Sequence, residues 1–141
     1  MGYSTDFTGR IQIVPPLNPA EIDYLQEFAD GEVSYSDHKD EPDSYCSFEP
    51  DDSGAFVEWS YREKTSDAVE WVQFLINHFL REGAIASTSS DEQFEGFTFN
   101  HILNGELEAD GEESRDLWLL KVVNNRVTRH EAIITYSSTE S

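Results

Sequence analysis

Apolar and polar residues alternate near the N-terminus, a pattern that predicts a β-strand over residues 7–13 (FTGRIQI). One face of this strand carries Phe7, Gly9, Ile11 and Ile13. The pair Pro15-Pro16 ends the pattern, because proline has no amide hydrogen to donate to a neighbouring strand.

The next segment carries the start signals of an α-helix. Asn18 suits the N-cap, Pro19 suits the first helical position, and Glu21 completes a capping box three residues after the cap. Leu17 and Ile22 occupy the two positions of a hydrophobic staple. Helical spacing then predicts a buried stripe of Ile22, Leu25, Phe28 and Ala29, and Asp30-Gly31 ends the helix.

The middle of the chain predicts a polar, acidic loop over residues 31–44, followed by two short strands at 45–48 and 55–61. The turn between these strands falls at 50–54. A second helix is predicted from residue 66 to its end at 81–83. Apolar residues cover more than one stripe of this helix, which indicates a core element covered on two sides. Residues 86–93 predict a mobile loop.

The last third predicts three strands, at residues 97–109, 117–123 and 126–136, with Asn124-Asn125 as a two-residue turn. The order β-α-β-β-α-β-β-β indicates one α+β domain over residues 1–136, with a mainly antiparallel sheet, two helices and a flexible tail at 137–141. Its first six elements follow the order of a ferredoxin-like core, to which a C-terminal hairpin is added.

Composition adds an unusual charge to this pattern. The chain has 29 Asp and Glu against nine Lys and Arg, a formal net charge of −20, while aromatic residues make up 13% and indicate a globular protein. Direct nucleic-acid binding requires a basic stripe, which is missing, and the charge steers the protein toward basic partners. No apolar run has membrane-spanning length and no secretory signal is evident, so we expect no membrane association and a cytoplasmic location.

The densest acidic segment, ELEADG at residues 106–111, invites comparison with a calcium loop. Its acids and glycine fit the first positions of such a loop, but position 12 is Leu117, so the closing glutamate is missing. The alternation of these acids with Leu107 and Ala109 favours a strand with one solvent-exposed face.

Acids arranged on such a face can also imitate the phosphate backbone of DNA, or otherwise match a basic protein surface. The alternative is that the acids only keep the protein soluble. The acidic residues we predict to contact a partner are Glu106, Glu108, Asp110, Glu112, Glu113, Asp51 and Asp52.

No spacing of histidines or cysteines defines a catalytic or metal site. The histidines, His38, His78, His101 and His130, stand apart in the sequence. His78 is predicted on a helix surface, whereas strand pairing could bring His101 and His130 together with Asp116. Cys46 is predicted to be a small buried residue. We assign no catalytic residue, no metal ligand and no cofactor, and expect a non-enzymatic protein.

The aromatic residues divide into core and surface candidates. The predicted core residues are Trp59, Trp71 and Trp118, and the predicted surface anchors are Tyr3, Tyr24, Tyr35 and Tyr61.

Three long segments, MGYSTDFTGRIQIVPPLNPAEIDYLQEFAD, VEWVQFLINHFL and LNGELEADGEESRDLWLLKVVNNRVTRHEAIITY, carry a resemblance. Together they resemble a group of small acidic proteins of unknown function from phage and bacterial genomes. Members of that group often have an arginine-rich segment after the first helix, where this chain has Gly31-Glu32-Val33. The resemblance implies a phage or mobile-element setting and brings no catalytic residues.

We therefore expect a small acidic protein that binds a basic protein partner, as a phage-encoded inhibitor or DNA-mimic-like modulator of a host or defence protein. In that setting the location is the host cytoplasm. The alternatives are a small-ligand or metal-binding domain at His101, His130 and Asp116, and an accessory structural protein of a phage.

Overall fold

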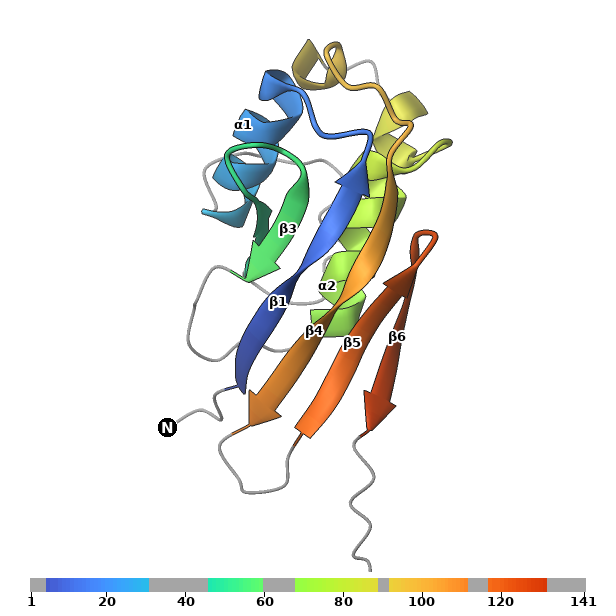
Figure 1. Cartoon of the computed structure of the whole chain (residues 1–141). Helices are drawn as coiled ribbons and strands as arrows, with labels where there is room; N and C mark the ends of the chain where they lie inside the picture. Colours follow the sequence, from blue (N-terminus) through green and yellow to red (C-terminus); the bar gives the residue numbers. More distant parts are fainter. Residues whose placement is uncertain (1–4, 31–45, 60–67, 89–91, 112–116, 132–141) are drawn as a thin grey trace, which may run out of the picture.

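The chain folds into one antiparallel sheet and two helices, as a computed structural model shows (Figure 1). The structure describes residues 5–30, 46–59, 68–88, 92–111 and 117–131. This arrangement confirms the predicted α+β class. No helix in these ranges is long and apolar enough to cross a membrane.

Six strands within the described residues form the sheet in the order β2-β3-β1-β4-β5-β6, with antiparallel pairing throughout. Their bounds are β1 Thr5–Val14, β2 Phe48–Pro50, β3 Phe56–Trp59, β4 Ile102–Gly111, β5 Leu117–Val123 and β6 Arg126–Glu131. β3 lies between β1 and β2, and β1 lies between β3 and β4, which is the arrangement of the predicted split βαβ core. The β5–β6 hairpin extends this core at one edge, as predicted.

Helix α1 (Pro19–Ala29) begins as predicted, whereas helix α2 (Ala68–Leu75) continues into a π-helical turn at Ile76–Leu80. The start predicted for the second helix, at residue 66, lies outside the described residues, as do the loop at 31–44 and the tail. Short 3-10 turns occupy Ile85–Thr88 and Glu92–Phe94, which overlap the two ends of the loop predicted at 86–93.

Several strand boundaries differ from the prediction, and the starts of β2 and β4 differ most. β2 begins at Phe48, where the predicted strand ended. β4 begins at Ile102, five residues later than predicted, because Phe99 has a positive φ of 50° and the amide of His101 donates to the carbonyl of Leu80. The segment before β4 therefore packs against the end of the helical region and not against β1.

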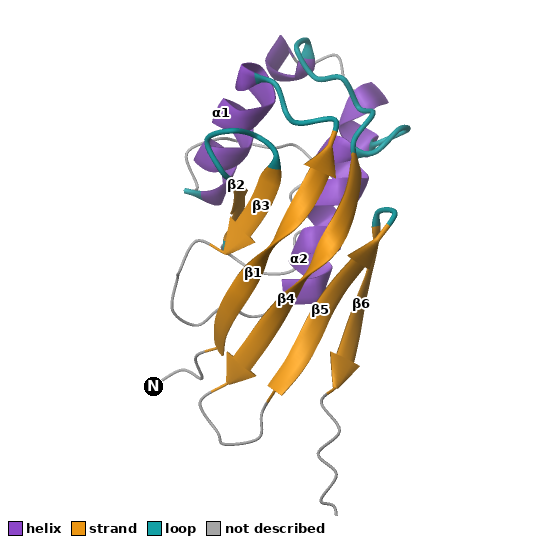
Figure 2. Ribbon diagram, in the orientation of Figure 1, coloured by secondary structure: helices purple, strands orange, loops and turns teal. Residues whose placement is uncertain are grey.

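The core lies between the helices and one face of the sheet (Figure 2). Phe7 of β1 makes edge contacts with Phe48, Trp59 and Trp118, with ring centroids 5.5 to 5.7 Å apart. Phe28 of α1 contacts Trp71 of α2 at 6.1 Å, so the helices pack against each other. All three tryptophans are buried, which confirms the predicted core.

The opposite face of the sheet, which we call the open face, is exposed to solvent in the described residues. On β4, Leu107 and Ala109 point into the core, whereas Glu106, Glu108 and Asp110 are exposed. This segment pairs in register with both β1 and β5, so it is the predicted strand with one solvent-exposed face and not a calcium loop.

Substitution of Gly105 by alanine tests the close contact of β1 and β4. Gly105 has a φ of +152°, and a Cβ atom there would lie 2.8 Å from the carbonyl oxygen of Arg10 and 2.9 Å from the Cα atom of Ile11. We expect Gly105→Ala to lower the free energy of unfolding by about 3 kcal/mol, measured by urea denaturation. Gly83→Ala is the control, because its φ is +74° but no atom lies within 4 Å, and it should cost only about 1 kcal/mol. Equal losses would contradict a steric role for this contact.

Candidate functional site

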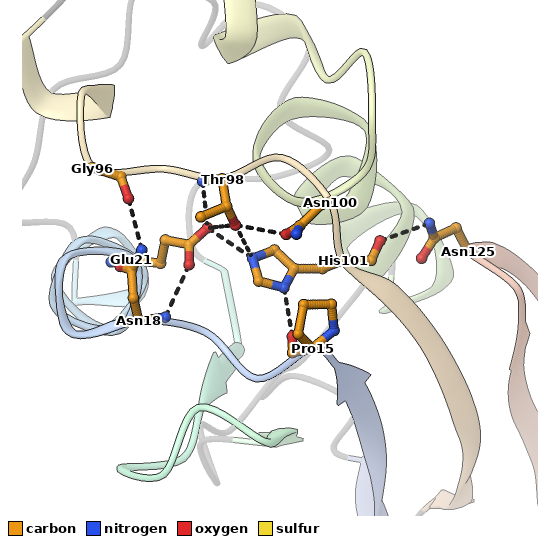
Figure 3. A network of polar contacts seen from close by, with 8 residues as sticks. All are labelled: Pro15, Asn18, Glu21, Gly96, Thr98, Asn100, His101 and Asn125. Atoms are coloured by element: carbon orange, nitrogen blue, oxygen red, sulfur yellow. Dashed lines mark hydrogen bonds and ion pairs between the residues drawn. The ribbon is translucent and has the colours of Figure 1, made fainter.

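A buried glutamate–histidine pair joins the start of α1 to the start of β4 (Figure 3). The predicted capping box is present: the side chain of Asn18 accepts from the amide of Glu21, and Glu21 Oε1 accepts from the amide of Asn18, both at 2.9 Å. The second carboxylate oxygen, Oε2, lies 2.8 Å from His101 Nε2. Glu21 and His101 are 0% and 1% exposed. One carboxylate therefore caps the helix and holds the histidine.

The histidine has hydrogen-bond acceptors at both ring nitrogens. His101 Nδ1 lies 2.6 Å from the carbonyl oxygen of Pro15, which can only accept, so Nδ1 carries a proton. Nε2 faces the carboxylate of Glu21, and the amide of Thr98 donates to the same oxygen at 3.3 Å. His101 is therefore an imidazolium when Glu21 is ionised.

Opposing effects act on the pKa of each group. Burial alone raises the pKa of Glu21, but hydrogen bonds from His101, Asn18 and Thr98 outweigh burial and bring the pKa below its usual value. Burial alone lowers the pKa of His101, but its bonds to Glu21 and the carbonyl of Pro15 raise the pKa above its usual value. Both shifts favour the charged pair.

Asn125 attaches the β5–β6 turn to the same region. Its side chain donates to the carbonyl of His101 at 3.0 Å and accepts from the amide of Leu103 at 2.7 Å. Asn124 and Asn125 have φ values of 47° and 71°, which confirms the predicted two-residue turn. The buried pair is thus linked to the start of α1, to the segment before β4 and to the β5–β6 turn.

The structure corrects the predicted histidine site. His101 is buried at the start of β4, whereas His130 is exposed on the open face of β6, where it pairs across the sheet with Leu119. β5 separates the strands of these two histidines, and Asp116 lies outside the described residues. Among the residues that the structure describes, no group of three or more His, Cys, Asp and Glu side chains is placed to hold a metal ion.

Two other predictions about exposure were wrong. His78 is 3% exposed and stacks on Phe74 with ring centroids 4.0 Å apart, because the π turn directs it into the core. Tyr24 is 5% exposed and packs its ring against Phe94 and Phe97, so it is a core residue and not a surface anchor.

Cys46 is buried as predicted, and its thiol lies 3.2 Å from the carbonyl oxygen of Phe48. The other predicted anchors, Tyr3, Tyr35 and Tyr61, lie outside the described residues.

The acids of β4 differ in their neighbours on the open face. Glu106 lies between Arg10 of β1 and Lys121 of β5, so two cations flank it. Glu108 lies between a threonine and a leucine, and Asp110 lies directly opposite Asp6. Like charges opposite each other in a sheet are destabilising. Negative charge without flanking cations is therefore concentrated at the C-terminal end of β4, at Glu108 and Asp110.

We call Asp6, Glu108, Asp110 and Leu117 the acidic patch. Leu117 pairs with Asp110 and is 44% exposed, so an apolar side chain lies among the acids. A depression of 380 Å³ beside them is lined by Glu108, Leu117 and Leu119, among other residues. The patch thus offers negative charge and apolar surface together.

The remaining predicted contact residues do not join this patch. Asp51 and Asp52 lie in the turn between β2 and β3, at the opposite side of the sheet from β5. Glu112 and Glu113 lie outside the described residues. Asp6 was missed because its place opposite Asp110 depends on the register of β1 with β4, which the local sequence does not reveal.

The fold and these sites define a small α+β protein with a six-stranded antiparallel sheet and a charged open face, within the described residues. Comparison with protein-family models, with curated proteins and with solved structures finds no significant match to the chain.

Removal of the charge on Glu21 tests the buried pair. We expect Glu21→Gln to lower the free energy of unfolding by about 3 kcal/mol, because His101 loses its counterion and the amide of Thr98 loses a carboxylate acceptor. Glu27→Gln changes an exposed residue of the same helix and should alter the free energy by less than about 0.5 kcal/mol. Urea unfolding measures both, and similar small losses would contradict an ionised pair.

The pH dependence of stability tests the charge on His101. A raised folded-state pKa gives a stabilisation that is complete below the unfolded-state pKa, about 6.5, and is lost as pH rises through the folded-state pKa. Glu21 has the opposite sign: its contribution is present above its unfolded-state pKa and is lost as pH falls through its lowered folded-state value. We expect the free energy of unfolding to decline above about pH 6.5 in the wild type.

The control for the pH experiment is His101→Gln, measured by urea unfolding over the same range. This variant lacks the titrating ring, so the part of the decline that His101 causes should disappear. An identical decline in both proteins would refute the assignment of this charge.

Proposed function

We propose that the protein binds a protein partner through the acidic patch on its open face. The observation that carries this proposal is the direct opposition of Asp6 and Asp110, beside exposed Leu117. In the free protein these two carboxylates repel each other, and a cation from a partner would reduce this repulsion. The exposed leucine adds apolar surface, which protein interfaces bury at their centre.

The partner surface that fits this patch combines Lys or Arg side chains with apolar ones. Arg10 and Lys121 on either side of Glu106 interrupt the row of acids on β4, and this argues against a continuous imitation of a phosphate backbone. A compact basic and apolar protein surface suits the patch better than a long nucleic-acid-binding groove. The net charge of −20 also accelerates encounter with such a partner.

The resemblance to small acidic phage proteins supports a phage or mobile-element setting for this interaction. In that setting the chain acts without catalysis, as a phage-encoded modulator that covers a basic surface of a host or defence protein. The metal-binding alternative has no supporting geometry, because His101 is committed to Glu21 and Pro15.

Capture from bacterial lysate tests the patch. The patch variant combines Asp6→Asn, Glu108→Gln and Asp110→Asn. The control combines Asp23→Asn, Glu27→Gln and Glu82→Gln, which removes the same charge from exposed residues outside the patch. We expect wild type and control to retain the same partner, identified by mass spectrometry, and the patch variant to lose about tenfold or more of it.

Salt provides the second measurement. Binding of the identified, purified partner should weaken strongly between about 0.05 and 0.3 M salt, because exposed charges are screened over about 10 Å or less at such concentrations. Equal capture by the patch variant and the control, or a partner without a basic surface, would refute the proposal.

A further inference from the structure

The outer edge of the sheet at β6 presents backbone groups that are available for strand pairing. The amide of Val127 donates outward to the side chain of Gln73, so Val127 does not use this amide to pair with β5. Because backbone direction alternates along a strand, the amides of Arg129 and Glu131 also point outward. No described residue accepts a hydrogen bond from either of them.

Gln73 of α2 occupies the position that a peptide group of another strand would take. Its Oε1 accepts from the amide of Val127 at 2.9 Å, and its Nε2 donates to the carbonyl of Asn125 at 3.1 Å. The amide of Val127 and the carbonyl of Asn125 are the backbone groups at the start of β6 that an added strand would otherwise bond. The side-chain amide therefore closes the edge at Val127 and leaves the amides of Arg129 and Glu131 open to another strand.

A groove lies between the α2 region and β6, which it meets at Val127. It has a volume of 480 Å³, and Val69, Phe74 and Val127 form its apolar lining. Figure 1 shows β6 as the last strand of the sheet, with α2 passing behind the neighbouring strands. At about 3.4 Å per residue, the remaining edge at 128–131 matches the central part of an extended peptide of about five residues.

The charge along β6 differs from that of the whole molecule. Arg126 and His130 project on the open face, and Lys121 lies next to them on β5. On the helix side, Arg129 lies over the ring of Trp118 and pairs with Glu131. A strand beside β6 would thus meet the cation of Arg126 and the imidazole of His130 on the open side, and a groove of mixed apolar and polar lining on the helix side. Cross-strand pairs favour opposite charges.

We propose that the outer edge of β6 and its groove bind an extended peptide of alternating acidic and apolar residues, which adds to the sheet as an antiparallel strand. The acidic side chains face Arg126 and His130, and the apolar ones enter the groove beside Val69 and Phe74. Such strand addition combines backbone hydrogen bonds with side-chain pockets. This edge adjoins the acidic patch, because His130 and Glu131 also line the depression beside Glu108 and Leu117. The proposal does not rest on the proposed function.

The first test uses fluorescein-labelled Glu-Val-Glu-Val-Glu and the charge-reversed Lys-Val-Lys-Val-Lys as probes. Salt of about 0.15 M limits the Debye length to about 8 Å and screens the distant acids of the chain. Fluorescence anisotropy should show tighter binding of the glutamate peptide. Hydrogen exchange of the Arg129 and Glu131 amides should slow when this peptide is added to the wild type. Preference for the lysine peptide, or unchanged exchange, would overturn the proposal.

A second test removes one backbone donor. Arg129→Pro lacks the outward amide but leaves the amides that pair with β5, and proline is tolerated at such an edge. Arg129→Ala removes the same side chain and keeps the amide. We expect Arg129→Pro to bind the glutamate peptide about tenfold more weakly than Arg129→Ala. Equal affinity in these variants would overturn strand addition, with thermal unfolding as the check on folding.

Two further measurements separate the other possible occupants and sites. If the edge instead accepts a second copy of the chain, analytical ultracentrifugation will show a dimer without peptide that Arg129→Pro abolishes, and this would replace the proposal. The patch variant should bind the glutamate peptide at least as well as wild type. Failure of the peptide experiments leaves capture by the acidic patch unaffected, so the two proposals fail independently.

Discussion

The hydrogen-bonded ion pair between Glu21 and His101 connects parts of the chain that are 80 residues apart. Glu21 belongs to the first turn of α1, and His101 immediately precedes the long central strand β4. The same two residues fix the backbone around them, through the capping box at Asn18, the carbonyl of Pro15 and the amide of Thr98. This buried polar contact therefore helps to fix the orientation of α1 relative to the sheet. Since both groups are buried, each is a costly charge without the other.

The two faces of the sheet have different surroundings. The helices cover one face, where aromatic rings such as Phe7, Phe28 and Trp71 fill the space between the layers. The open face has no described element over it, and its side chains are free to vary without loss of packing. Its opposed acids and exposed leucine do not stabilise the fold. Their arrangement is the observation on which the proposed contact with a partner rests.

Local sequence signals predicted most helices and strands, whereas they could not predict contacts between residues far apart in the chain. The capping box of Asn18 and Glu21, the alternation along β4 and the Asn124-Asn125 turn each depend on neighbouring residues. The partner of Glu21 could not be found this way, although its spacing from Leu25 and Phe28 places it on the buried side of α1, and a buried carboxylate requires a partner. His78 was misplaced because regular helical periodicity does not apply within a π turn. The acidic row was predicted as exposed, but the cations beside Glu106 became evident only from the strand register.

The register also shows why net charge alone describes this molecule poorly. Glu108 and Asp110 have no cation opposite them on the adjoining strands, while β6 carries Arg126 and Arg129, and Lys121 lies on its neighbour β5. A partner close to the sheet meets these local charges, because screening in salt hides most of the distant acids. The total of −20 governs the approach of a partner, whereas the pairing of individual side chains determines where it binds. The local charge therefore changes sign between the acids at Glu108 and Asp110 and the cations at Arg126 and Lys121, although all lie on one small sheet.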